Sequence, residues 1–103
     1  MRMHSGIDIQ APRGTTVFPA APGRVVYAKW KRGYGLMVEL DHGNGFSTIY
    51  AHCSRLLVGE GKIVQTGTSI AQVGSTGVTT GSHLHFEVIH GSKLENPLKF
   101  LAK

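Results

Sequence analysis

The sequence predicts an all-β fold, mostly antiparallel, in which the sheets form an open groove. Fourteen glycines among 103 residues are typical of short strands joined by tight turns. Apolar and polar residues alternate most clearly over residues 83–88, as the side chains of a strand with one buried face do. The pair Asn44-Gly45 separates two further alternating segments, which is a strong signal for a hairpin turn.

The expected elements follow from local residue types. Residues 62–67 and 69–73 are expected to form a compact hairpin, and residues 54–57 a single turn of helix. Asn96 is placed to cap a short C-terminal helical turn, with Pro97 at its first position. β-branched and aromatic residues at a period of two favour the remaining strands. These are expected over residues 4–9, 17–20, 24–30, 36–40, 46–52 and 83–88.

Composition limits the classes of partner. The net charge of +5 and the pI near 9.7 favour anionic partners, such as nucleic acid or an anionic cell wall. The basic residues are scattered apart from residues 29–32 and no recognition helix is visible, so nucleic-acid binding is the weaker alternative. No apolar run is long enough to cross a bilayer, and no signal-peptide core follows Met1. Cys53 is the single cysteine and is interpreted as a small packing residue.

One face of the strand at 83–88 carries residues suited to chemistry. His83, His85 and Glu87 share one parity, and Leu84 and Phe86 share the other. Two imidazoles side by side can hold a metal, or hold a metal together with a proton-transfer group. The alternative is an exposed strand that happens to carry histidines.

Other metal-compatible residues are expected to reach the same groove. His4 and Asp8 share a strand face with Gly6 between them, and His52 ends the strand at 46–52, on the face of Thr48. A catalytic zinc site keeps three protein ligands and one open position, where the metal lowers the pKa of its water. Two further histidines then serve proton transfer and oxyanion stabilisation. This set matches amide hydrolysis, and without an H-E-x-x-H helix a thermolysin-type protease is excluded.

An ordered set of short motifs along the chain resembles a known family. Each motif is weak alone, and their order along nearly the whole length is specific. They are His4-Ser5-Gly6-Ile7-Asp8-Ile9, Ala20-Ala21-Pro22-Gly23-Arg24-Val25-Val26, Gly33-Tyr34-Gly35, Asp41-His42-Gly43-Asn44-Gly45, Tyr50-Ala51-His52, Gly74-Ser75-Thr76-Gly77, Gly81-Ser82-His83-Leu84-His85-Phe86-Glu87 and Asn96-Pro97. The chain is similar to the lysostaphin-type peptidoglycan endopeptidases, also called M23 metallopeptidases or LytM domains.

The resemblance implies a barrel-sandwich-like fold, one zinc ion and a set of roles. The family's metal ligands fall on His4, Asp8 and His85, and its catalytic pair falls on His52 and His83. The implied substrate is a peptide cross-link of bacterial peptidoglycan, with D-alanyl–diaminopimelate links favoured over glycyl-glycine bridges. An extracytoplasmic location and a monomer are expected, without nucleic acid as a partner.

Several alternatives stay open. Residues 1–103 are expected to form one M23-type domain that lacks an upstream segment, because only three residues precede His4. A non-catalytic domain that retains zinc, and binds the wall or activates other hydrolases, is the second function, although the retained ligand set argues against it. Glu87 either orients a histidine or is an ordinary solvated residue. His42 is interpreted as an exposed turn residue and His90 as a surface residue.

Overall fold

The computed structural model of the chain describes residues 6–77, 81–91 and 93–95. In this part the chain is all-β, without a helix. The strands are β1 (Ile7–Gln10), β2 (Thr16–Val17), β3 (Gly23–Lys31), β4 (Gly35–Gly43), β5 (Phe46–Leu56), β6 (Ile63–Val64), β7 (Ala71–Val73), β8 (His83–His90) and β9 (Lys93–Glu95). No helix of the described chain is long and apolar enough to cross a membrane.

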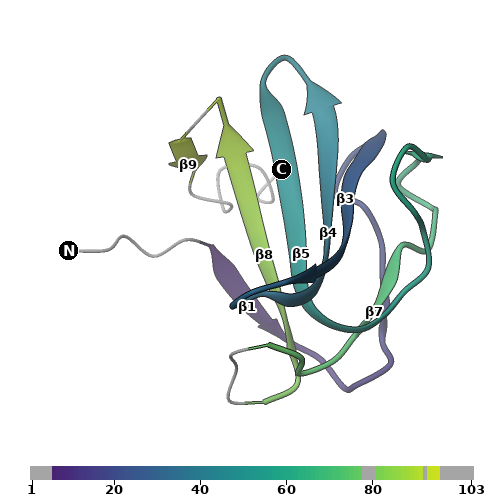
Figure 1. Cartoon of the computed structure of the whole chain (residues 1–103), viewed down its shortest axis with the longest axis vertical. Helices are drawn as coiled ribbons and strands as arrows, with labels where there is room; N and C mark the ends of the chain where they lie inside the picture. The colour runs from purple at the N-terminus through teal and green to yellow at the C-terminus, as the bar shows by residue number, and fades with distance from the viewer. Residues whose placement is uncertain (1–5, 78–80, 92, 96–103) are drawn as a thin grey trace.

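One open antiparallel sheet contains these strands, which confirms the predicted fold class. Its main order is β1-β8-β5-β4-β3-β6, and Figure 1 shows β8, β5, β4 and β3 side by side. Off this path, β7 pairs with β2 and β5, and β9 pairs with β8. The longest strands therefore occupy the centre of the sheet, and the shorter β1 lies against β8 at one side.

The predicted turn between β4 and β5 is confirmed. Asn44 has φ of 55° and Gly45 has φ of 80°, the pair of left-handed conformations that a two-residue hairpin turn requires. Gly43 pairs with Phe46 directly across the turn. This turn sets the register of β4 against β5 and, through β5, of β8.

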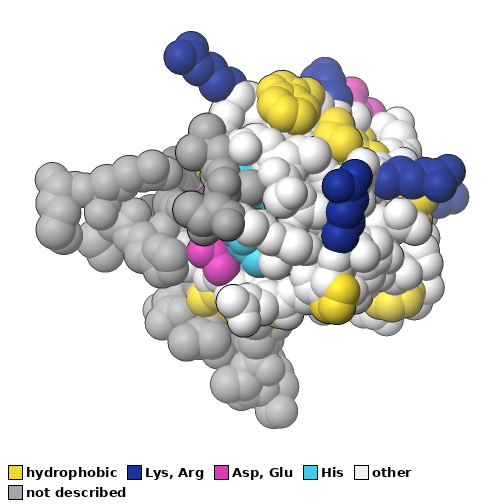
Figure 2. Space-filling model, turned by 90° about the horizontal axis from the view of Figure 1, so that it is seen from below, with side chains coloured by type: hydrophobic (Ala, Val, Ile, Leu, Met, Phe, Trp, Pro, Cys, Tyr) yellow, Lys and Arg dark blue, Asp and Glu magenta, His cyan; other side chains and the backbone are white. Residues whose placement is uncertain are grey.

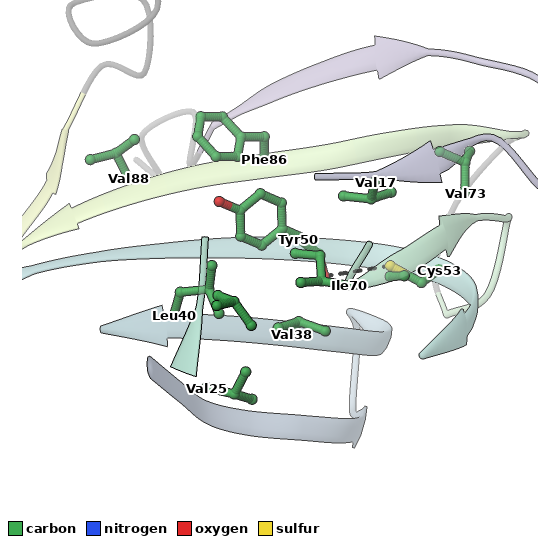
Figure 3. Close-up of a cluster of buried hydrophobic side chains, with 12 residues drawn as sticks. Val17, Val25, Val38, Leu40, Tyr50, Cys53, Ile70, Val73, Phe86 and Val88 are labelled. Carbon is green, nitrogen blue, oxygen red and sulfur yellow. Dashed lines mark hydrogen bonds between the residues drawn. The ribbon is translucent and has the colours of Figure 1, made fainter. Parts of the chain in front are cut away.

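The main core lies on one face of the sheet. Tyr50, Phe86, Val38, Leu40 and Cys53 are all at most 2% exposed, and Figure 3 shows them packed together with Val25 and Ile70. Cys53 is thus a packing residue, as predicted. A smaller cluster of Met37, Ile49 and Ala51 lies apart from this core.

Two local expectations are wrong, a third holds only at Val17 because β2 ends there and residues 18–20 are not in a strand, and one lies outside the described residues. Residues 54–57 do not form a helical turn, because β5 continues to Leu56 and pairs there with β7. The segment 62–73 is not a hairpin, because β6 pairs with β3 and β7 pairs with β2 and β5. Both errors have one cause. These short segments pair with strands that are distant along the chain, and local patterns do not reveal such partners. The expected helical turn at 96–101 lies outside the described residues.

Candidate active site

The register of three strands brings an acidic residue and a histidine together. Asp8 on β1 and Ala51 on β5 both lie opposite His85 on β8. Directly opposed residues of antiparallel strands have their side chains on the same face. Asp8 Oδ1 accordingly lies 2.7 Å from His85 Nδ1 and 3.6 Å from His83 Nε2. This face is the one opposite to Phe86 and the main core.

His85 is oriented by a buried carboxylate. Its Nε2 lies 2.8 Å from Glu87 Oε2, and Glu87 is 1% exposed. Because a carboxylate accepts, Nε2 donates to Glu87 and Nδ1 donates to Asp8 Oδ1. The hydrogen bond to Glu87 raises the pKa of His85, and the one to Asp8 adds to this, against the effect of burial. A cation bound by Asp8 and His85 would replace the Nδ1 proton.

His52 reaches this face through a break in the alternation of β5. Strict alternation would place it with Thr48 and Tyr50, on the core side. Instead His52 has φ of 62°, rare for a residue with a side chain, and its N–H donates to Tyr34 O at 2.8 Å. The pairing of β5 with β4 shifts at this point: Val38 pairs with Tyr50 and Leu36 with Cys53, so Ala51 and His52 lie against Met37 alone. The expectation that His52 shares the face of Thr48 is therefore wrong, because a bulge turns its side chain to the other face.

The ring of His52 consequently lies among the other histidines. Its centroid is 5.2 Å from that of His83 and 5.9 Å from that of His85. Burial lowers the pKa of His52, with the neighbouring histidines contributing and a hydrogen bond to Thr76 opposing. His52 is therefore neutral at pH 7 and able to accept a proton.

Thr76 positions the ring of His52, a role that no local sequence pattern predicts. Its carbonyl accepts a hydrogen bond from His52 Nδ1–H at 2.6 Å. Its hydroxyl donates to Cys53 O at 2.6 Å and accepts from Leu36 N–H at 3.1 Å. A Cβ on Gly35 would lie 2.5 Å from Thr76, so only glycine permits this approach. The small residues at 74–77 were the available signal, and they indicated close backbone approach but no partner.

His83 has the same tautomer as His52. Its Nδ1–H donates to Gly81 O at 2.9 Å, which leaves Nε2 as the basic atom near Asp8. His52 and His83 therefore donate from Nδ1 to backbone carbonyls, whereas both ring nitrogens of His85 face carboxylates. The three histidines thus differ in their hydrogen-bond partners.

The structure brings together four of the five predicted site residues: Asp8, His52, His83 and His85. His4 lies outside the described residues, and within the described ranges no three His, Cys, Asp or Glu side chains form a complete metal-ligand group. Seen from below in Figure 2, histidine and acidic side chains lie next to each other, and the Lys and Arg side chains lie farther away, toward the top and the right of the view.

The interpretations of the remaining polar residues had different outcomes. Glu87 is buried against His85, so the solvated alternative is wrong. His42 is not an exposed turn residue, because it lies in β4 and its ring nitrogens bond to Pro22 O at 2.7 Å and Thr48 Oγ1 at 2.6 Å. His90 is exposed as predicted, and its ring stacks on Phe46 at 4.0 Å.

Two proteins similar in sequence to this chain differ in their described activity. The DD-carboxypeptidase/endopeptidase Mpg of Neisseria meningitidis is 44% identical over 97 residues, which are 94% of this chain and 22% of that protein. The murein hydrolase activator NlpD of Escherichia coli is 41% identical over 99 residues, covering 95% of this chain and 26% of NlpD. The chain thus spans about a quarter of the length of these relatives.

Solved structures share the fold. The catalytic domain of lysostaphin from Staphylococcus simulans superposes with a TM-score of 0.91 at 34% identity, over 98% of this chain and 80% of that one. A zinc-containing peptidase from Vibrio cholerae superposes with a TM-score of 0.84 at 33% identity, over 87% of this chain and 28% of that one. The model of Peptidase family M23 matches residues 2–97. The chain belongs to peptidase family M23.

Proposed function

We propose that this chain is a zinc metalloendopeptidase that hydrolyses peptide cross-links of bacterial peptidoglycan. The observation that carries the proposal is the difference in hydrogen-bond partners among the three histidines around Asp8. Both ring nitrogens of His85 face carboxylates, whereas His52 and His83 donate from Nδ1 to backbone carbonyls. One face of the sheet therefore combines a ligand-type histidine with two histidines whose Nε2 atoms are basic.

The metal ligands in this proposal are His4, Asp8 and His85. The fit rests on Asp8 and His85, whose oxygen and nitrogen lie 2.7 Å apart; the proton that these atoms share is the one that a bound cation would replace. Imidazole and carboxylate are also ligands that zinc accepts. When bound, zinc would polarise the scissile carbonyl and lower the pKa of a water.

His52 and His83 divide the proton chemistry. We assign proton acceptance from the attacking water to His52, because its lowered pKa keeps Nε2 unprotonated and able to accept. His83 stabilises the oxyanion that develops during this attack. Nε2 of His52 then returns the proton to the leaving amine. Glu87 and Thr76 do not touch the substrate, and their role is to fix the rings of His85 and His52.

The proposed bond is a D,D-peptide link rather than a glycyl-glycine bridge. The support is the similarity to Mpg, a DD-carboxypeptidase/endopeptidase, while lysostaphin shares the fold at lower identity. The net charge of +5 suits an anionic wall. We accordingly propose that the domain acts outside the cytoplasm, as a monomer and without nucleic acid.

The test is digestion of purified peptidoglycan by the zinc-loaded protein. Release of new amines, with fragments identified by mass, is the expected result, and digestion of a wall with glycine bridges compares the two bond types. His83→Ala should keep zinc and lose turnover, whereas Asp8→Ala should lose zinc. Loss of zinc in His83→Ala together with retention in Asp8→Ala would reverse these roles.

The similarity to NlpD supports a second candidate, an activator of other murein hydrolases. In that case zinc-loaded protein releases no amines alone but increases product release by an added murein hydrolase. Measuring both activities on one peptidoglycan sample separates the two functions.

A further inference from the structure

A row of aromatic and basic side chains extends from the candidate active site across the sheet. Tyr27 lies opposite Glu39 on β4, Glu39 lies opposite Ile49 on β5, and Ile49 lies opposite Glu87 on β8. Opposed residues share a face, so Tyr27 is on the same face as the histidines. Lys29 and Lys31 have the same parity along β3 and continue this row.

The row connects to the site through Tyr34. The Tyr34 ring centroid lies 6.3 Å from that of His85. Lys31 Nζ lies 5.8 Å from the Tyr34 ring and 5.6 Å from the Tyr27 ring. Such contacts hold an ammonium group in place by cation–π attraction. The ammonium of Lys31 therefore lies one aromatic ring beyond the site.

Backbone hydrogen bonds join the turn at Lys31 to the bulge of β5 at His52. Tyr34 N–H donates to Lys31 O at 3.0 Å, and Tyr34 O accepts from His52 N–H at 2.8 Å. Lys31 also pairs across the sheet with Gly35, which contacts the Thr76 backbone as described above. The position of Lys31 relative to His52 is thus set by backbone hydrogen bonds.

The two lysines differ in their electrostatic partners. Lys29 Nζ lies over the Tyr27 ring at 4.9 Å and pairs with Glu60 Oε2 at 3.3 Å. Lys31 has no carboxylate within ion-pair distance among the described residues. Lys31 acts on Glu39, a partly buried carboxyl. Burial raises the pKa of Glu39, and the positive charge of Lys31 lowers it. The charge of Lys31 can therefore pair with a ligand carboxylate, whereas the charge of Lys29 is paired with Glu60.

We propose that Lys31, Tyr27 and Tyr34 form a subsite for a carboxylate of the peptide substrate. The inference rests on the proposed function and specifies it: the preferred substrate is an acidic peptide. An extended peptide covers about 3.5 Å per residue. The two ring distances place Lys31 Nζ within about 12 Å of the His85 ring centroid, so a ligand carboxylate there belongs to a residue at most about three positions from the scissile bond. Lys31 supplies the charge, and the two tyrosine rings contact the apolar part of the peptide chain.

The test compares two cross-linked peptidoglycan peptides that differ only in one carboxylate, present as the free acid or as the amide. The variants are Lys31→Gln and the matched control Lys29→Gln, both zinc-loaded. Lys31→Gln should lower kcat/KM on the acid about two- to five-fold, as expected for a partly exposed charge pair. The change should appear in KM, because the contact is the same in the ground and transition states. The amide should be hydrolysed equally by both variants and the wild type.

Each other outcome contradicts the inference in a recognisable way. Equal losses for both lysine variants would indicate general attraction by net charge rather than a subsite. An unchanged preference for the acid in Lys31→Gln would also overturn the subsite. If the wild type hydrolyses neither peptide, the proposed function fails instead. Calorimetric binding of the same two peptides then tests the subsite by itself, and equal affinity of the wild type for acid and amide refutes it.

Discussion

Replacing Glu87 by glutamine should weaken zinc binding without disturbing the fold. Glu87 is 1% exposed and lies 2.8 Å from His85 Nε2. Glutamine has nearly the same volume and can still accept the hydrogen bond, so only the charge is removed. A charge-assisted hydrogen bond is about twice as strong as a neutral one, and a neutral one contributes about 1 kcal/mol. The loss of about 1 kcal/mol corresponds to a fall in zinc affinity of roughly 5-fold.

Competition with a chromophoric chelator at fixed pH measures this affinity, and thermal unfolding shows that the variant is folded. The control is Glu39→Gln, because Glu39 is a partly buried carboxyl on the same face whose main interactions are with Lys31 and neighbouring carboxylates. We expect the control to bind zinc as the wild type does. A folded Glu87→Gln variant with wild-type affinity would refute the view that the buried carboxylate orients His85 for metal ligation.

Three further predictions concern the fold around the site. Thr76→Val removes the hydroxyl that bonds to Leu36 N–H and Cys53 O. It should lower the free energy of unfolding by about 2 kcal/mol, or Tm by about 10 °C. Thr76→Ser should lower them far less, and equal losses for the two variants would contradict the assigned hydrogen bonds. Gly35→Ala should lower the free energy of unfolding by about 3 kcal/mol or more, and Gly33→Ala by about 1 kcal/mol. Both glycines have positive φ, but only Gly35 contacts Thr76. Similar Tm values for the two variants would contradict this steric explanation. Burial raises the pKa of Cys53 to about 12, so a thiol reagent at pH 8 should label it only after unfolding, and rapid native labelling would contradict its place in the core.

Local sequence patterns predict the parts of the site that depend on side-chain direction within one strand. The alternation of residues 83–88 placed His83, His85 and Glu87 on one face, and β8 confirms it. The Asn44-Gly45 turn was equally predictable, because two left-handed residues are a local requirement. The expectation that Asp8 and His52 would approach this strand came from the combination of residue types and from the resemblance, and the pairing of β1 and β5 with β8 brings them there.

Only the tertiary structure decided which face His52 takes and what holds the histidines. The turn of His52 toward His83 depends on a bulge in the pairing of β5 with β4, where Ala51 and His52 lie against Met37 alone. The hydrogen bond from His52 to Thr76 and the burial of Glu87 likewise depend on residues that are distant along the chain. Alternation along a strand is a local consequence of backbone geometry. The choice of partner strand is settled by packing of the whole sheet, and no segment contains that information alone.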